Sequence, residues 1–238
     1  MKKLGWFLLV LILLSAVAYG FGGPSPRKEE GGTPAVSVGE KYVIGDFESG
    51  SLRAPKEWWT FDIQTADVVS NLALTSGDGK IAAEVGKYSM QLKGTASNWY
   101  AGGCGTYFAK ENQNLAKYNY LQLDMFGNGP GSGTLKIELY DDDNHNWQVE
   151  QDPAKGYAPI YDDKFVYDIN VDWVGWKRIS IPPADFVDDN PGVGDDVWNP
   201  EQAGGSGGLL QMQFICIAAK SEGSVNYNID NVYLTVSE

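Results

Sequence analysis

The chain has 238 residues, of which 43% are hydrophobic and 13% aromatic, so it can bury one core of substantial size. Its 31 acidic residues outnumber its 18 basic residues, and the formal net charge is −13. A surface this acidic repels nucleic acid and anionic lipid, so we predict a neutral partner and no binding to nucleic acid. A catalytic Ser-His-Asp triad is poorly supported, because His145 is the only histidine.

The first 20 residues predict a signal peptide. Two lysines precede an apolar run over residues 4–14, and small residues follow it, so we expect cleavage after Ala18 or Gly20. The alternative is an uncleaved membrane anchor, although the run is shorter than the ~20 apolar residues that a span needs. We therefore expect an exported protein, whether secreted, periplasmic or at the cell surface, with no membrane contact beyond this leader.

Residues 21–38 are rich in Gly, Pro and charge and predict a flexible linker, which leaves residues 39–238 as one domain. Short β-prone runs then alternate with clusters of Gly, Pro, Asn and Asp, and no long helical period interrupts them. This pattern predicts an all-β fold, a jelly-roll β-sandwich of two antiparallel sheets. We predict its strands over residues 39–48, 58–63, 68–75, 88–93, 99–108, 120–126, 134–140, 147–150, 165–170, 176–181, 209–218 and 226–236.

Several of these segments also indicate which strand faces are buried and where the backbone takes a special geometry. Residues 118–125 and 134–140 alternate between apolar and polar side chains, as half-buried strands do. Residues 211–218 become apolar throughout, which predicts a central strand covered on both faces. The glycines over residues 102–105 indicate a bulge or a close backbone approach. Two prolines at 182–183 predict a short helical turn.

The first and last strands are expected to be neighbours. Each carries a carboxylate where its alternation of apolar and polar residues is interrupted. Asp46, Glu48 and Asp230 would then converge on a hard cation, and calcium is the expected ion. The alternative is that these carboxylates face solvent or cap turns. Asp141, Asp143 and His145 also match positions of a calcium loop, but Asn146 replaces its glycine, so that match is weak.

Aromatic residues beside polar ones are the second chemical signal. Several of the 8 Trp and 13 Tyr lie next to Asp, Asn or His in loop-like settings. An aromatic ring offers an apolar face to a sugar, and the polar neighbours hydrogen-bond its hydroxyls. For each ring, a place in the core is the alternative. Such residues include Trp58, Trp59, Trp99, Tyr100, Trp147, Trp173 and Trp198.

The order of several motifs resembles the family 11 carbohydrate-binding modules and, more loosely, the galactose-binding-like jelly rolls that include complex I intermediate-associated proteins. The resemblance implies a noncatalytic jelly roll that is stabilised by calcium and binds β-glucan in a cleft. The motifs are Val38-Gly39-Glu40-Lys41, Asp46-Phe47-Glu48, Asn146-Trp147, Trp176 to Pro182 with Phe186, and Ile229-Asp230-Asn231-Val232.

The resemblance also implies positions for the cleft. Asp143 matches a cleft carboxylate, and Trp99 or Tyr100 matches a cleft aromatic. The family's basic residues after Phe186 are replaced by acidic ones here, and a cleft tyrosine near Cys216 is missing. We predict a carbohydrate site made of Trp99, Tyr100, Asp143, His145, Asn146, Trp147, Asp188 and Trp198.

Two further features stay open in the sequence. Cys104 and Cys216 would meet an oxidising compartment after export, where they form either one disulfide or two buried thiols. Residues 152–163 form an insert with Tyr157 and Tyr161, and we expect it to shape the cleft.

The prediction is therefore a secreted, noncatalytic protein that binds a polysaccharide such as a β-glucan and carries a structural calcium. Other envelope or cellulolytic proteins are further expected partners. The alternative is an envelope structural or adaptor protein that uses the same fold for protein contact. A small glycosidase or lyase is a third reading, and Asp143 would be its first catalytic candidate.

Overall fold

The computed structural model describes residues 39–74, 85–108, 114–202 and 207–237. The predicted signal peptide and linker lie outside these residues and stay predictions. No helix in the described part of the chain has the length and apolar character needed to span a membrane.

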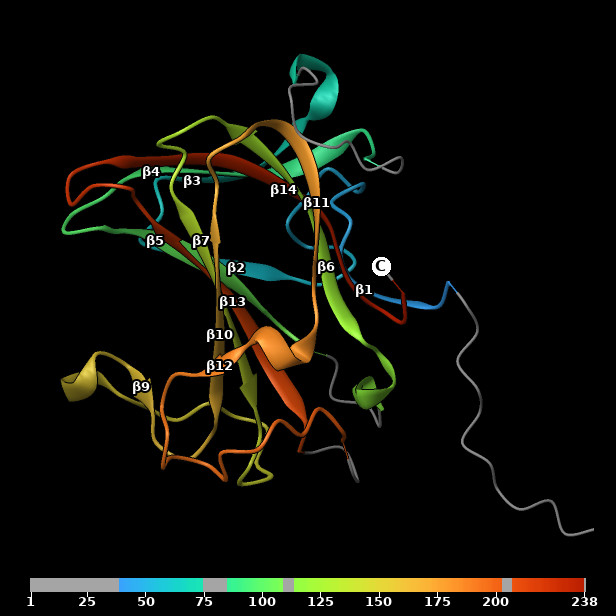
Figure 1. Cartoon of the computed structure of the whole chain (residues 1–238), viewed down its shortest axis with the longest axis vertical. Helices are drawn as coiled ribbons and strands as arrows, with labels where there is room; N and C mark the ends of the chain where they lie inside the picture. Colours follow the sequence, from blue (N-terminus) through green and yellow to red (C-terminus); the bar gives the residue numbers. More distant parts are fainter. Residues whose placement is uncertain (1–38, 75–84, 109–113, 203–206, 238) are drawn as a thin grey trace, which may run out of the picture. The chain divides into compact units, whose positions relative to one another are not determined.

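Two six-stranded antiparallel sheets make up the domain (Figure 1). Sheet I has the order β11-β6-β14-β4-β3, with β1 also paired to β14, and sheet II has the order β12-β10-β7-β13-β5-β2. The two layers confirm the predicted all-β sandwich. Sheet I contains β1 (Lys41–Gly45), β3 (Thr65–Ser70), β4 (Tyr88–Thr95), β6 (Tyr120–Asn128), β11 (Val174–Ile181) and β14 (Ser224–Thr235). Sheet II contains β2 (Trp58–Phe61), β5 (Tyr100–Tyr107), β7 (Thr134–Asp141), β10 (Lys164–Asn170), β12 (Val187–Asp188) and β13 (Leu209–Ile217).

Short elements connect these strands. A two-residue hairpin pairs β8 (Gln151–Asp152) with β9 (Ala158–Pro159) beside the main sheets. The predicted turn after the two prolines is confirmed by η4. The 3-10 helices are η1 (Asn71–Ala73), η2 (Leu115–Lys117), η3 (Pro153–Lys155) and η4 (Pro183–Asp185).

The core lies between the sheets and follows the alternation of the strands. In β7, Leu135, Ile137 and Leu139 are buried, while Lys136 and Glu138 point to the other face of sheet II. Burying each such side chain contributes about 1.5–3 kcal/mol, so the packed layers hold together without a crosslink. Both cysteines are free, buried thiols in this core, which decides between the two alternatives that the sequence left open.

The predicted contact between the first and last strands is confirmed. β1 pairs with β14 in the register Tyr42↔Leu234 and Val43↔Tyr233, and the register shifts before Gly45. After β1, Phe47 adopts a φ of 53° and packs its buried ring against Trp58. The two ends of the domain sequence therefore share one sheet.

Two predicted strands differ from the structure. Residues 147–150 are not a strand, because the amide of Trp147 donates to the Asp142 side chain (2.9 Å) instead of to a neighbouring strand. β3 ends at Ser70, whose hydroxyl accepts from the Leu72 amide (3.3 Å) and begins η1. Side-chain caps thus compete with strand pairing at both places.

Two predictions about strand faces are corrected as well. β13 is central in sheet II, but its Gln213 and Ile215 are only partly buried, so that face is not fully covered. The polar face of β6 is buried, since Gln122 and Asp124 are 2% and 0% exposed. Alternation in the sequence identified both strands but not what covers each face.

Candidate functional site

A groove with a volume of about 660 Å³ lies on the face of sheet II that points away from the core. Strands β10, β7, β13, β5 and β2 form its floor, Asp62 follows β2, and the β8–β9 segment contributes Gln151, Gly156 and Tyr157. Its lining residues are Trp59, Phe61, Asp62, Tyr100, Glu138, Tyr140, Gln151, Gly156, Tyr157, Lys164, Gln213 and Ile215.

The strand register places these side chains in rows across the sheet. Glu138 is opposite Gln213, which is opposite Gly105, and Gly105 is opposite Trp59. One row therefore runs from a carboxylate through an amide to an indole ring. Such cross-strand neighbours lie about 4.5–5.5 Å apart at Cβ, within reach of a single bound molecule.

The glycines of β5 explain how the aromatic rings fit. A Cβ on Gly105 would lie 2.5 Å from Cζ2 of Trp59, and one on Gly103 would lie 2.7 Å from Cζ of Phe61. Because neither glycine has a side chain, both rings lie directly over β5. The Trp59 ring also contacts Tyr107, with ring centroids 4.6 Å apart. The close approach predicted for residues 102–105 is confirmed.

Hydrogen bonds orient the polar groups of the groove. The hydroxyl of Tyr100 donates to Asp62 (3.0 Å), and that of Tyr140 donates to Glu138 (2.6 Å). Burial and then the neighbouring carboxylate raise the pKa of Tyr100, and the same two causes raise the pKa of Tyr140. Both phenols therefore stay protonated, and the two carboxylates keep oxygen atoms that can accept further hydrogen bonds.

The insert contributes an aromatic residue to the groove, as predicted. Asp152 caps η3 through the Ala154 amide (2.9 Å), and its carbonyl accepts from the Tyr157 amide (2.9 Å). Gly156 ends this turn in the left-handed region, and Tyr157 follows with a φ of 63°. Tyr157 is 64% exposed, so its ring is available to a ligand.

The predicted carbohydrate residues do not gather in one place. Of the eight, Tyr100 lines the groove. Trp99, directly before β5, is 50% exposed but is not among the lining residues. Trp147 packs against the core, and Trp198 packs its ring between Phe165 (5.3 Å) and Phe186 (6.2 Å). For these two tryptophans, the core alternative is the one that the structure adopts.

The polar members of that prediction lie outside the groove, Asp188 in β12 and the others in loops. The amide of Asn146 donates to Asp142 (3.0 Å), and its side chain donates to Glu150. His145 lies against Gly207, where an added Cβ would be 2.9 Å from Nδ1. Asp188 accepts from the Asn190 amide (2.9 Å) in the loop that follows β12. The hydrogen bonds of Asn146 and Asp188 help to fix the chain at these positions.

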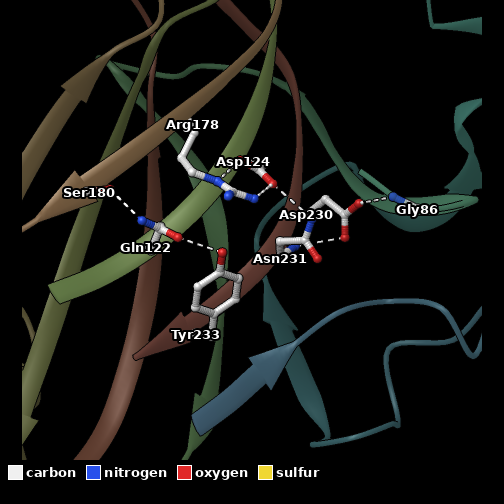
Figure 2. A network of polar contacts seen from close by, with 8 residues as sticks. All are labelled: Gly86, Gln122, Asp124, Arg178, Ser180, Asp230, Asn231 and Tyr233. Atoms are coloured by element: carbon white, nitrogen blue, oxygen red, sulfur yellow. Dashed lines mark hydrogen bonds and ion pairs between the residues drawn. The ribbon is translucent and has the colours of Figure 1, made fainter. Parts of the chain in front are cut away.

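The predicted cation trio is only partly brought together. Asp230 accepts from the amides of Gly86 (3.2 Å) and Asn231 (2.8 Å), as Figure 2 shows. Glu48 accepts from the Tyr88 amide (3.0 Å), two residues along the chain from the Gly86 amide that binds Asp230. Burial raises the pKa of Asp230 to about 7, and Glu48 adds to the shift. Asp46 instead accepts from the amide of Glu48 (3.3 Å).

A polar network surrounds Asp230 on the outer face of sheet I (Figure 2). Arg178 donates twice to Asp124 (2.9 and 2.9 Å), and the Asn231 side chain donates to the same carboxylate (2.9 Å). Next to it, Gln122 donates to the hydroxyl of Ser180 (2.6 Å) and accepts from that of Tyr233 (2.6 Å). These partners allow polar side chains of β6 to be buried.

A different trio of carboxylates comes close together at the end of sheet II. One oxygen each from Asp141, Asp143 and Asp163 lies within 4.8 Å of the others, the one such group among the described residues. Burial raises the pKa of Asp141 to about 8 and that of Asp163 to about 7, and Asp143 adds to both shifts. Electrostatic repulsion within this acidic group is therefore substantial.

The sequence contained a signal for the groove that our site prediction missed. In the stretch 58–61, one tryptophan must point inward and the next outward, and Trp58 is the buried one. The alternation of β7 likewise places Glu138 opposite to the core. Strand order decides which outward-facing residues line the same groove. The residues next to each position in the sequence do not encode that order.

No protein-family model matches the chain, and no curated protein matches it significantly. Solved structures of carbohydrate-binding modules resemble it. A family 11 module from Clostridium thermocellum, in complex with a β-1,3-1,4-mixed-linked tetrasaccharide, is 18% identical with a TM-score of 0.48; the match covers 84% of this chain and 96% of that one.

Two further structures show the same kind of similarity. The family 11 module of a cellulosomal cellulase of C. thermocellum is 17% identical over 85% of this chain and 97% of that chain, with a TM-score of 0.47. A CBM28 module specific for non-crystalline cellulose is 16% identical over 83% and 95%, with a TM-score of 0.43. The chain is thus similar to solved family 11 modules, the family that its sequence motifs resemble, at identities of 17–18%.

Proposed function

We propose that the domain is a noncatalytic carbohydrate-binding module that holds a polysaccharide in the groove of sheet II. The observation that carries the proposal is the row of ring, amide and carboxylate across β2, β13 and β7. Trp59 supplies an apolar surface, while Gln213 and Glu138 supply hydrogen-bonding groups at fixed positions. A sugar chain presents both kinds of surface at once.

The size and charge of the groove narrow the ligand class. Its volume of about 660 Å³ falls within the roughly 300–1,000 Å³ typical of ligand sites. Lys164, the lining residue with a positive charge, is paired with Asp189 at 2.7 Å. Asp62 and Glu138 leave the groove acidic, so a neutral polysaccharide is favoured over an anionic one. A mixed-linked β-1,3-1,4-glucan is the first ligand to test, because the family 11 module described above is in complex with a β-1,3-1,4-mixed-linked tetrasaccharide.

The same proposal includes export and a structural calcium. Glu48 and Asp230 fit a hard cation, because both carboxylates accept from backbone amides of residues 86–88 and each keeps acceptor capacity beyond its backbone hydrogen bonds. The ion would supply positive charge beside the buried Asp230. Glu48→Gln should then reduce the rise in melting temperature that calcium produces. The measurement compares melting temperatures with and without chelator.

Affinity gel electrophoresis against a panel of polysaccharides tests the proposed function. We expect β-glucan in the gel to slow the full chain relative to a non-binding reference protein, while Trp59→Ala migrates normally. Reducing ends measured on the same substrates should not increase. Unchanged mobility of the wild type on every glucan, xylan and mannan contradicts the proposal.

A further inference from the structure

Three acidic side chains meet where β7 ends and β10 begins. Asp141 is the last residue of β7, Asp143 follows in the next loop, and Asp163 directly precedes β10. Because Lys164 pairs with Tyr140, the two strands meet at this end of sheet II, and the Asp141 amide donates to the Asp163 carbonyl (3.3 Å). One carboxylate oxygen from each of the three lies within 4.8 Å of the others.

Each carboxylate is fixed by a backbone amide on one oxygen. Oδ2 of Asp141 accepts from Asn199 (3.3 Å), that of Asp163 from Val197 (3.1 Å), and that of Asp143 from Asp163 itself (2.9 Å). The Oδ1 atoms of Asp141 and Asp163 accept no hydrogen bond, although both side chains are fully buried. A buried carboxylate oxygen without a partner is costly unless something else neutralises it.

Gly194 shows that the space beside these oxygens is kept free of side chains. A Cβ added there would lie 2.3 Å from Asp163 Oδ1 and 2.3 Å from Asp143 Oδ2, and the φ of this residue is 75°. The loop backbone therefore approaches the carboxylates directly. Oxygens from two of the three acidic residues face the same point.

Among the described residues, no positive side chain compensates the group. Between described residues, no lysine or arginine forms an ion pair with any of the three carboxylates. Lys164, adjacent in sequence, is paired with Asp189 instead (2.7 Å). Asp195 adds a further carboxylate nearby, whose charge acts on all three.

We propose that Asp141, Asp143 and Asp163 bind a calcium ion at this end of sheet II, separate from the cation expected at Glu48 and Asp230. The ligands are all carboxylate oxygens, which matches the preference of Ca²⁺ for hard oxygen donors. The ion would connect the end of β7, the start of β10 and the loop around residue 194. Glu138, Tyr140 and Lys164 of the groove lie on these same two strands.

Calcium titration of the chelator-treated full chain tests this site without any polysaccharide. Isothermal titration calorimetry should report binding that Asp163→Asn and Asp141→Asn each abolish. Calcium at 100 times its dissociation constant should raise the melting temperature of the wild type by about 5–10 °C. Each Asn variant should lack that increase at this site.

The variants also separate metal binding from folding. Asn keeps the shape of Asp and removes one repulsive charge, so without calcium each variant should melt no lower than the wild type. Glu48→Gln is the matched control, because it removes a carboxylate from the other expected cation site and should leave this calcium binding intact. The inference is overturned if calcium binds and stabilises Asp141→Asn and Asp163→Asn as it does the wild type, or if calcium does not bind the wild type.

Discussion

The outer faces of the two sheets differ although their strands have the same alternating pattern. On sheet I, the polar side chains Gln122, Asp124 and Tyr233 are buried and bonded to one another or to their neighbours. On sheet II, Glu138 and Gln213 line a groove. Alternation therefore predicts a strand with two faces, whereas neighbouring strands decide whether the polar face becomes a network or a site.

The cause of this difference lies in the residues opposite each polar side chain. Arg178 is opposite Asp124 in the strand register and donates to it twice. Gln213 is instead opposite Gly105, which has no side chain to cover it. Gly105 on the central strand β5 thus leaves space on the outer face of the sheet. The ring of Trp59 occupies this space from one side, and a ligand can occupy it from the other.

The largest expected effect is on the network of sheet I. Asp124→Ala removes the carboxylate to which Arg178 and Asn231 donate, and we expect the free energy of unfolding to fall by about 3 kcal/mol. Denaturant titration measures this change. Asp67→Ala, an exposed change on the same sheet, should alter stability by less than about 0.5 kcal/mol. Equal effects of the two variants would contradict the role of the network. Loss of glucan binding in a folded Asp124→Ala variant would show that sheet I also contributes to binding, contrary to the difference between the two outer faces.

The next effect concerns the glycine under the indole ring. Gly105→Ala places a Cβ 2.5 Å from the Trp59 ring and 2.9 Å from the Met212 carbonyl oxygen, so we expect a cost of about 1–3 kcal/mol in stability and weaker glucan binding. A double-mutant cycle separates the two contacts, since the affinity change should largely disappear in a Trp59→Ala background. An affinity change of the same size in both backgrounds would show that the glycine does not act through the ring.

A smaller effect is expected at the insert. Tyr157→Ala removes an exposed ring from the groove and should lower glucan affinity about five-fold, equivalent to about 1 kcal/mol, with little change in melting temperature. Tyr161→Ala is the matched control, because Tyr161 is also exposed but is not among the lining residues. Calorimetric titration compares the two, and equal losses would remove the specific role of Tyr157.

Much of the fold could be predicted from the sequence, because one strand's alternation is a local property. The turn at Pro183 and the close backbone approach at Gly105 are likewise local, whereas the pairing of β1 with β14 is long-range and was predicted from their places as first and last strands. Strand ends were harder to predict, since caps such as Ser70 compete with the ladder of strand hydrogen bonds.

The site could be predicted much less well. Trp198 lies beside polar residues in sequence, yet its ring packs between Phe165 and Phe186, because burying a large ring against the core outweighs the character of its neighbours. Glu138 and Trp59 are about 80 residues apart in the chain and meet only through the order of four strands. Neither local spacing nor composition contains that order.

The most direct measurement of the central claim is the affinity of a soluble mixed-linked β-glucan oligosaccharide for Trp59→Ala and Trp99→Ala, by isothermal titration calorimetry. Both residues are accessible tryptophans, but only Trp59 lines the groove. We predict that Trp59→Ala weakens binding about 30-fold or more, as loss of a central aromatic contact does, while Trp99→Ala binds like the wild type. Wild-type affinity in a folded Trp59→Ala variant, or a larger loss in Trp99→Ala, would contradict a binding site in the groove of sheet II.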